Sequence, residues 1–115
     1  MLIIWPKVSG VRLKEVKKEE EKKMIKINEY LEGRVKSLGF EIDDVPYTAG
    51  VLLPGEYSFD TEKEEHLTVT VGEFELRPPG SDWKIAKIGD TVVIPAKSKF
   101  DLKVSKPASY VCAYK

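Results

Sequence analysis

From residue 34 onward, apolar and polar residues alternate in short runs that glycine, proline and aspartate separate. Alternation of this kind is typical of β-strands that bury one face. We expect strands within residues 34–40, 47–53, 56–61, 67–71, 74–77 and 83–88, and three more before the C-terminus. The turn at Gly72-Glu73 predicts a hairpin between the two runs that flank it. Short, evenly spaced strands with few helix signals favour an all-β sandwich or barrel.

Residues 14–23 break this pattern, because almost every one of them is charged. Such a run adds little to a core and is expected as a surface appendage, either a solvated helix or a disordered segment. We therefore divide the chain into a charged N-terminal extension, residues 1–23, and one domain, residues 24–115. Met24 is the expected natural start. Deletion of residues 1–23 is expected to leave the fold and activity nearly intact.

The composition excludes some classes of protein. With 42% hydrophobic and 33% charged residues, the 115-residue chain is expected to be a soluble globular domain with one modest core. Basic and acidic residues number 19 each, which argues against a nucleic-acid partner. No apolar run approaches the ~18 residues that cross a membrane. The single cysteine, Cys112, excludes an intrachain disulfide and favours a reduced, cytoplasmic setting.

The segment Gly89–Phe100 is the most informative part of the chain. A Gly-Asp turn leads into a β-branched run that Pro95 ends, and an alternating run begins at Phe100. This spacing resembles the second sequence motif of the cupins, which are small double-sheet β-barrels. In metal-binding cupins a histidine stands at the position of Phe100 and holds the metal. The resemblance predicts a single jelly-roll-like cupin barrel that has no metal or other cofactor.

Further segments along residues 26–115 are similar to one cupin family. They are Asn28–Tyr30, Val35–Phe40, Gly55–Thr61, Leu67–Val69 with Gly72, Asp82-Trp83, Gly89–Phe100 and Tyr110–Tyr114. On these segments the chain resembles the pyrimidine/purine nucleoside phosphorylases. The resemblance implies a pentosyltransferase that uses inorganic phosphate as co-substrate to cleave purine and pyrimidine nucleosides into ribose 1-phosphate and free base. It also implies a homodimer, so the expected partners are a nucleoside, phosphate and a second copy of the chain.

Phosphorolysis at an anomeric carbon passes through a cationic sugar, as glycoside hydrolysis does. Such a site needs donors for phosphate, a negative group near the sugar and a surface for the base. The expected phosphate-binding residues are the basic and hydroxyl residues of the matched segments, namely Lys36, Ser37, Lys97 and Ser98. A lysine binds phosphate as a point charge. Of the two lysines, Lys36 is the stronger candidate.

Glu65 is the expected catalytic residue. It lies seven residues before Gly72, as the metal-binding glutamate of the first cupin motif does, but the histidine pair that should precede it is missing. Without a metal, Glu65 is expected to hydrogen-bond the ribose hydroxyls or to stabilise the cationic sugar; an exposed loop position is the alternative. His66, the only histidine, is expected to point the other way in a surface or structural role.

Acceptance of many bases implies recognition by stacking. The expected substrate-binding residues are Tyr57, Phe59, Thr61, Phe100 and Tyr110. The first three share one face of their strand, because alternate residues of a strand point the same way. Core packing is the alternative for each aromatic residue, since a domain of this size needs most of them in its core.

Two other functions compete with the phosphorylase. A non-catalytic cupin that binds a sugar or nucleotide would use the same pocket, and only turnover that requires phosphate separates the two. A metal-dependent cupin oxidoreductase or isomerase is less consistent with the sequence, because a four-ligand cupin site needs more histidines than this chain has.

Overall fold

The structure is a computed structural model, and it describes residues 24–115. The charged N-terminal extension predicted for residues 1–23, and the expected effect of its deletion, lie outside the described residues. Within residues 24–115 the chain forms ten strands and one short 3-10 helix. They are β1 (Lys26–Tyr30), η1 (Leu31–Gly33), β2 (Val35–Ile42), β3 (Val45–Leu52), β4 (Gly55–Asp60), β5 (Glu65–Val71), β6 (Glu73–Arg77), β7 (Lys84–Lys87), β8 (Thr91–Ile94), β9 (Lys99–Val104) and β10 (Ala108–Tyr114).

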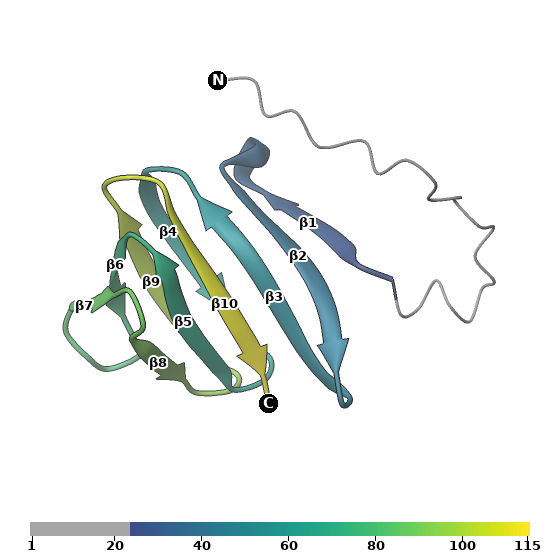
Figure 1. Ribbon diagram of the computed structural model, residues 1–115. Coiled ribbons are helices and arrows are strands. Elements are labelled where there is room, and N and C mark those ends of the chain that lie inside the picture. The colour runs from purple at the N-terminus through teal and green to yellow at the C-terminus, as the bar shows by residue number, and fades with distance from the viewer. Residues whose placement is uncertain (1–23) are drawn as a thin grey trace, which may run out of the picture.

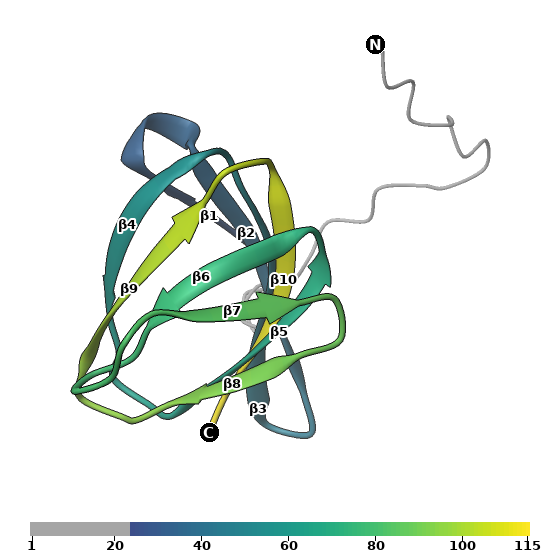
Figure 2. The same ribbon diagram turned by 90° about the vertical axis from the view of Figure 1, so that its left-hand side faces the viewer.

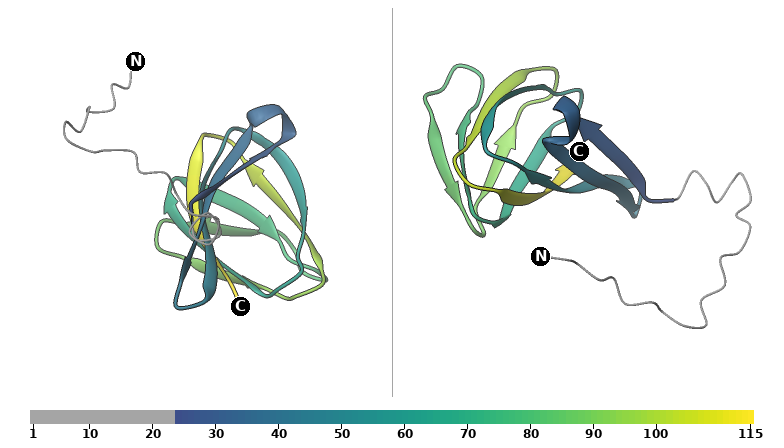
Figure 3. Two further views of the ribbon diagram at one scale, coloured as in Figure 1. Left: turned by 90° about the vertical axis from the view of Figure 1, so that its right-hand side faces the viewer. Right: turned by 90° about the horizontal axis from the view of Figure 1, so that it is seen from above.

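The strands form two antiparallel sheets. The six-stranded sheet has the order β1-β2-β3-β10-β5-β8 (Figure 1), and the four-stranded sheet has the order β4-β9-β6-β7 (Figure 2). The strands curve around a common interior (Figure 3). The predicted all-β, double-sheet fold is therefore confirmed. None of the helical structure in residues 24–115 has the length and apolar character needed to cross a membrane.

The predicted hairpin at Gly72-Glu73 is wrong. β5 pairs with β10 and β8 in one sheet, whereas β6 pairs with β9 and β7 in the other. Gly72 has a φ of +80°, and a Cβ atom there would lie 3.0 Å from the Cβ of Ala108. The turn thus connects β5 in the six-stranded sheet to β6 in the four-stranded sheet. The local pattern specifies a turn but not the partner of each strand, so it fits a hairpin and a crossing equally well.

One core lies between the sheets. It is built by the inward side chains of alternating strands, because successive residues of a strand point to opposite faces. Fully buried members from several strands are Val35, Leu52, Val69, Phe74, Leu76, Ile94, Leu102 and Cys112. Phe100, at the cupin metal-ligand position, is also buried in this core.

Candidate functional site

A cavity of about 300 Å³ lies between the two sheets. Its lining brings together five residues that the sequence predicted: Ser37, Phe59, Glu65, Phe100 and Tyr110. The sequence did not single out the other residues that line it: Tyr30, Leu52, Ser58, Asp60, Leu67, Leu102 and Tyr114. The volume is at the small end of the range for small-molecule sites.

Glu65 is the first residue of β5, and its side chain is buried. This position excludes the exposed loop that was the alternative reading. Burial raises the pKa of the Glu65 carboxyl, because removal from water disfavours its charged form; the Cys112 thiol, which donates to Oε1 at 3.5 Å, acts in the opposite direction. His66 does lie on the other side of the strand, with Nε2 2.9 Å from Glu64 Oε2.

The raised pKa of Glu65 predicts a pH-dependent effect on stability. The folded protein keeps the Glu65 proton at pH values where the unfolded chain, with a pKa near 4.5, has lost it. The stabilising contribution of this group is therefore present at low pH and is lost as pH rises through the folded pKa. Glu65→Gln should raise Tm relative to the wild type at pH 8 more than at pH 4. Thermal melts of both proteins check this, and an equal difference at the two pH values would contradict it.

Aromatic rings form much of the cavity wall. Phe59 and Phe100 lie opposite each other on β4 and β9, with ring centroids 5.5 Å apart. The Tyr57 ring lies 6.1 Å from Phe59, but its hydroxyl donates to the Leu53 carbonyl at 2.5 Å, and it does not line the cavity. The structure thus brings Phe59 and Phe100 to the cavity and places Tyr57 in the core beneath.

Tyr110 and Ser37 supply hydroxyl groups to the cavity. Burial raises the pKa of the Tyr110 phenol to about 12, although hydrogen bonds to Ser37 and Thr48 lower it in part. The phenol therefore stays protonated at neutral pH and can donate a hydrogen bond. Asn28 Nδ2 donates to Ser37 Oγ at 3.3 Å. Gly50 makes room for Tyr110, because a Cβ atom there would lie 2.6 Å from the tip of its ring.

The structure does not bring the other predicted residues to this cavity. Lys36 precedes Ser37 in β2, so its side chain lies on the opposite, exposed face, with Nζ 3.7 Å from Glu29 Oε1. Lys97 is exposed in the loop between β8 and β9. Thr61 Oγ1 donates to the Pro95 carbonyl at 2.7 Å and accepts from the Ser98 N–H at 2.9 Å, which fastens that loop to the end of β4.

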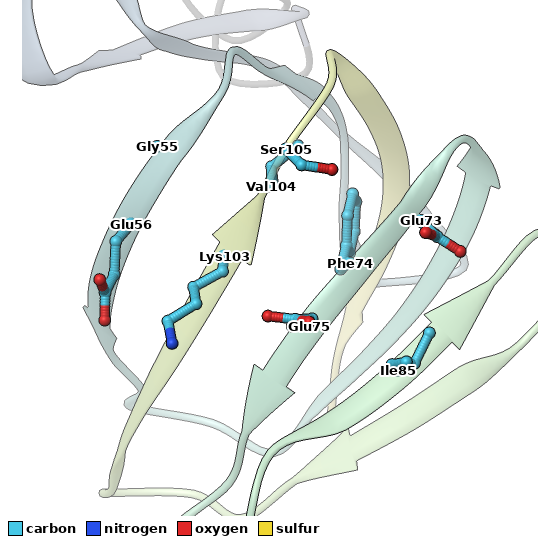
Figure 4. A pocket seen from close by; sticks show the side chains of 9 residues that line it. All are labelled: Gly55, Glu56, Glu73, Phe74, Glu75, Ile85, Lys103, Val104 and Ser105. Atoms are coloured by element: carbon cyan, nitrogen blue, oxygen red, sulfur yellow. The ribbon is translucent and has the colours of Figure 1, made fainter.

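A second hollow, of about 340 Å³, lies at the four-stranded sheet (Figure 4). Lys103 stands there between Glu56 and Glu75, its partners on the neighbouring strands. The Lys103 ammonium also lies 3.9 Å from the Trp83 ring centroid, so it already has an aromatic partner. With Glu73 the hollow holds three carboxylates. It contains none of the site residues predicted from the sequence, whereas the cavity between the sheets brings five of them together, so that cavity is the stronger candidate site.

Comparison with known proteins identifies the family. Residues 25–114 match the family described as pyrimidine/purine nucleoside phosphorylase. The chain belongs to this family. A curated relative from Yersinia pestis (strain Pestoides F), named pyrimidine/purine nucleoside phosphorylase, is 45% identical over 93 residues, which are 79% of this chain and 98% of the relative. The family predicted from the sequence is thus confirmed.

Solved structures of similar fold extend this result. A protein of unknown function from Vibrio parahaemolyticus is 38% identical, with a TM-score of 0.78 over 80% of this chain and 99% of that chain. The cupin-like protein HppE, solved with Fe(II), is 9% identical, with a TM-score of 0.66 over 79% of this chain and 56% of that chain. The HppE likeness shows the fold alone, and it confirms that this pyrimidine/purine nucleoside phosphorylase family member has the cupin-type architecture.

Proposed function

We propose that this family member is a pentosyltransferase that uses inorganic phosphate to cleave purine and pyrimidine nucleosides into ribose 1-phosphate and free base. The observation that supports this most is the buried Glu65 carboxylate in a cavity that aromatic rings and hydroxyl groups line. Family membership supports the reaction class independently. The expectation that no metal or other cofactor takes part stays a prediction.

Glu65 would act on the sugar. The transition state carries positive charge at the anomeric carbon and ring oxygen. A carboxylate held in a site of low dielectric stabilises that charge more than it stabilises the neutral ground state, and this difference is what raises turnover. Phe59 and Phe100 would face the base. Stacking against a ring requires only a π-face, so it tolerates purines and pyrimidines alike.

Phosphate would be held by neutral donors within the cavity. Asp60 and Glu65 line the cavity and would repel an anion, and among residues 24–115 no lysine or arginine lines it. The Ser58 side chain is exposed and its hydroxyl donates to Asp101 Oδ1 at 2.5 Å. We propose Ser37 and Tyr110 as the phosphate donors, because both line the cavity and neither is exposed. The assignments of Lys36, Lys97 and Ser98 stay predictions.

The acidic lining also favours the competing function. A cavity with two carboxylates suits a neutral sugar or nucleoside better than it suits a phosphate ion. A non-catalytic cupin that binds such a ligand is therefore the second candidate. The two are separated by incubation of the full-length protein with uridine or inosine, with and without phosphate. Release of base only with phosphate supports the phosphorylase, whereas binding without turnover supports the alternative.

We also propose that the protein is a homodimer that packs through the outer face of the six-stranded sheet. That face exposes Ile27, Leu38 and Val51 around an apolar hollow of about 540 Å³. Exposed apolar patches of this kind mark interaction sites, and a twofold dimer places one patch against its own copy. We expect a dimer by light scattering at micromolar concentration and a monomer for Val51→Lys. A monomeric wild type would contradict the proposal.

A further inference from the structure

Tyr30 lies where the open sides of the two sheets meet. It ends β1, an edge strand of the six-stranded sheet, whereas Phe59 lies in β4, an edge strand of the four-stranded sheet. The two rings are 6.5 Å apart in an edge-to-face arrangement, with an interplanar angle of 79°. Both line the cavity, and Tyr30 is 48% exposed. The ring of Tyr30 thus stands at the mouth, with one side toward solvent and one toward the cavity.

The backbone after Tyr30 holds this ring in place. Leu31 and Glu32 have φ values of +51° and +57°, a left-handed conformation that is unfavourable for residues other than glycine. Arg34 fixes the turn: its N–H donates to the Leu31 carbonyl at 3.2 Å, its carbonyl accepts from the Leu53 N–H at 2.9 Å, and its guanidinium donates to the Pro54 carbonyl. Strained backbone of this kind persists where the surroundings enforce it, often beside ligand sites.

We propose that Tyr30 and Phe59 form the base-binding end of the cavity. A planar nucleobase stacks on the Tyr30 ring at the mouth, and the ribose then points inward to Glu65. Because stacking needs no particular hydrogen-bonding edge, this arrangement would accept both purine and pyrimidine bases. The inference rests on the proposed function for the identity of the ligand. Its support from the structure is the position of Tyr30 and the aromatic character of the mouth.

The experiment is titration calorimetry with uridine and with inosine in the absence of phosphate. It compares wild type, Tyr30→Phe, Tyr30→Leu and the control Tyr47→Ala. Tyr47 stacks on Phe40, with centroids 5.7 Å apart, and does not line the cavity. We expect Tyr30→Leu to weaken binding about tenfold, more for the larger base of inosine, because a stacked base loses its aromatic partner. Tyr30→Phe and Tyr47→Ala should bind within about twofold of wild type, since neither loses ring contact with the base.

Steady-state kinetics extend the test. In Tyr30→Leu the nucleoside KM should rise by the same factor while the phosphate KM stays constant, which a loss of stability alone would not produce. Tight nucleoside binding by Tyr30→Leu, equal weakening in Tyr47→Ala, or no nucleoside binding by the wild type would each overturn the inference. Wild type that binds nucleosides through Tyr30 but does not turn them over with phosphate would instead contradict the proposed function and leave this inference standing.

Discussion

Replacement of Glu65 by glutamine is expected to lower turnover about a hundredfold and to leave saturation by phosphate within about twofold. Glutamine has the same shape and keeps an oxygen that can accept from the Cys112 thiol, so the packing around β5 should survive. Glutamine lacks the negative charge that we propose stabilises the cationic sugar in the transition state. An interaction made only in the transition state lowers turnover without a matching change in substrate affinity.

The matched control is Glu64→Gln. Glu64 is the neighbouring carboxylate, but it lies before β5, pairs with His66 and does not line the cavity. Rates measured against phosphate at saturating nucleoside should show the large loss in Glu65→Gln alone. If Glu65→Gln turns over as fast as the wild type, or if both variants lose the same activity, Glu65 has no special role in the reaction.

Replacement of Gly50 by alanine is expected to cost about 1–3 kcal/mol of stability, the usual range for overpacking, and to reduce kcat/KM at least about tenfold. The added methyl group would lie 2.6 Å from the Tyr110 ring. The Tyr110 ring packs against the Phe74 ring, with centroids 6.2 Å apart. We therefore expect the tip of the Tyr110 ring to move mainly toward the cavity. The substitution should therefore displace the phenol that we propose as a phosphate donor.

Gly39→Ala on the adjacent strand is the control for this substitution. An alanine Cβ there would lie 3.6 Å from its nearest neighbours, which is ordinary van der Waals contact. Thermal melts and initial rates of the two variants should differ clearly, with Gly39→Ala close to the wild type. Equal effects in both would show that any added methyl group in this sheet has the same consequence, and that Gly50 does not specifically make room for Tyr110.

The strands could be predicted from the sequence because a half-buried strand alternates apolar and polar residues. Nine of the ten strands observed in residues 24–115 follow the predicted runs within a few residues, whereas β1 (Lys26–Tyr30) was not predicted. The pairing of strands was not in the pattern, as Gly72 shows: its turn leads from β5 in one sheet to β6 in the other. The family resemblance supplied the double-sheet architecture, which alternation alone does not distinguish from other all-β folds.

The residues of the candidate site could be predicted only in part from the sequence. Lys36 and Ser37 were both predicted as phosphate-binding residues, but consecutive residues of a strand point to opposite faces, and of the two only Ser37 lines the cavity. Tyr30 was missed as a site residue although it lies in a matched segment. Its contact with Phe59 depends on the distance between the edges of the two sheets, and the local sequence does not specify that distance.

The most direct test of the proposed reaction is a product assay on the wild-type protein. Purified full-length chain is incubated with uridine and, separately, with inosine at several phosphate concentrations, and both free base and ribose 1-phosphate are quantified. We expect equal amounts of the two products from either nucleoside, at rates that saturate with phosphate and vanish without it. Base release that is independent of phosphate, or nucleoside binding with no release of base, would contradict it.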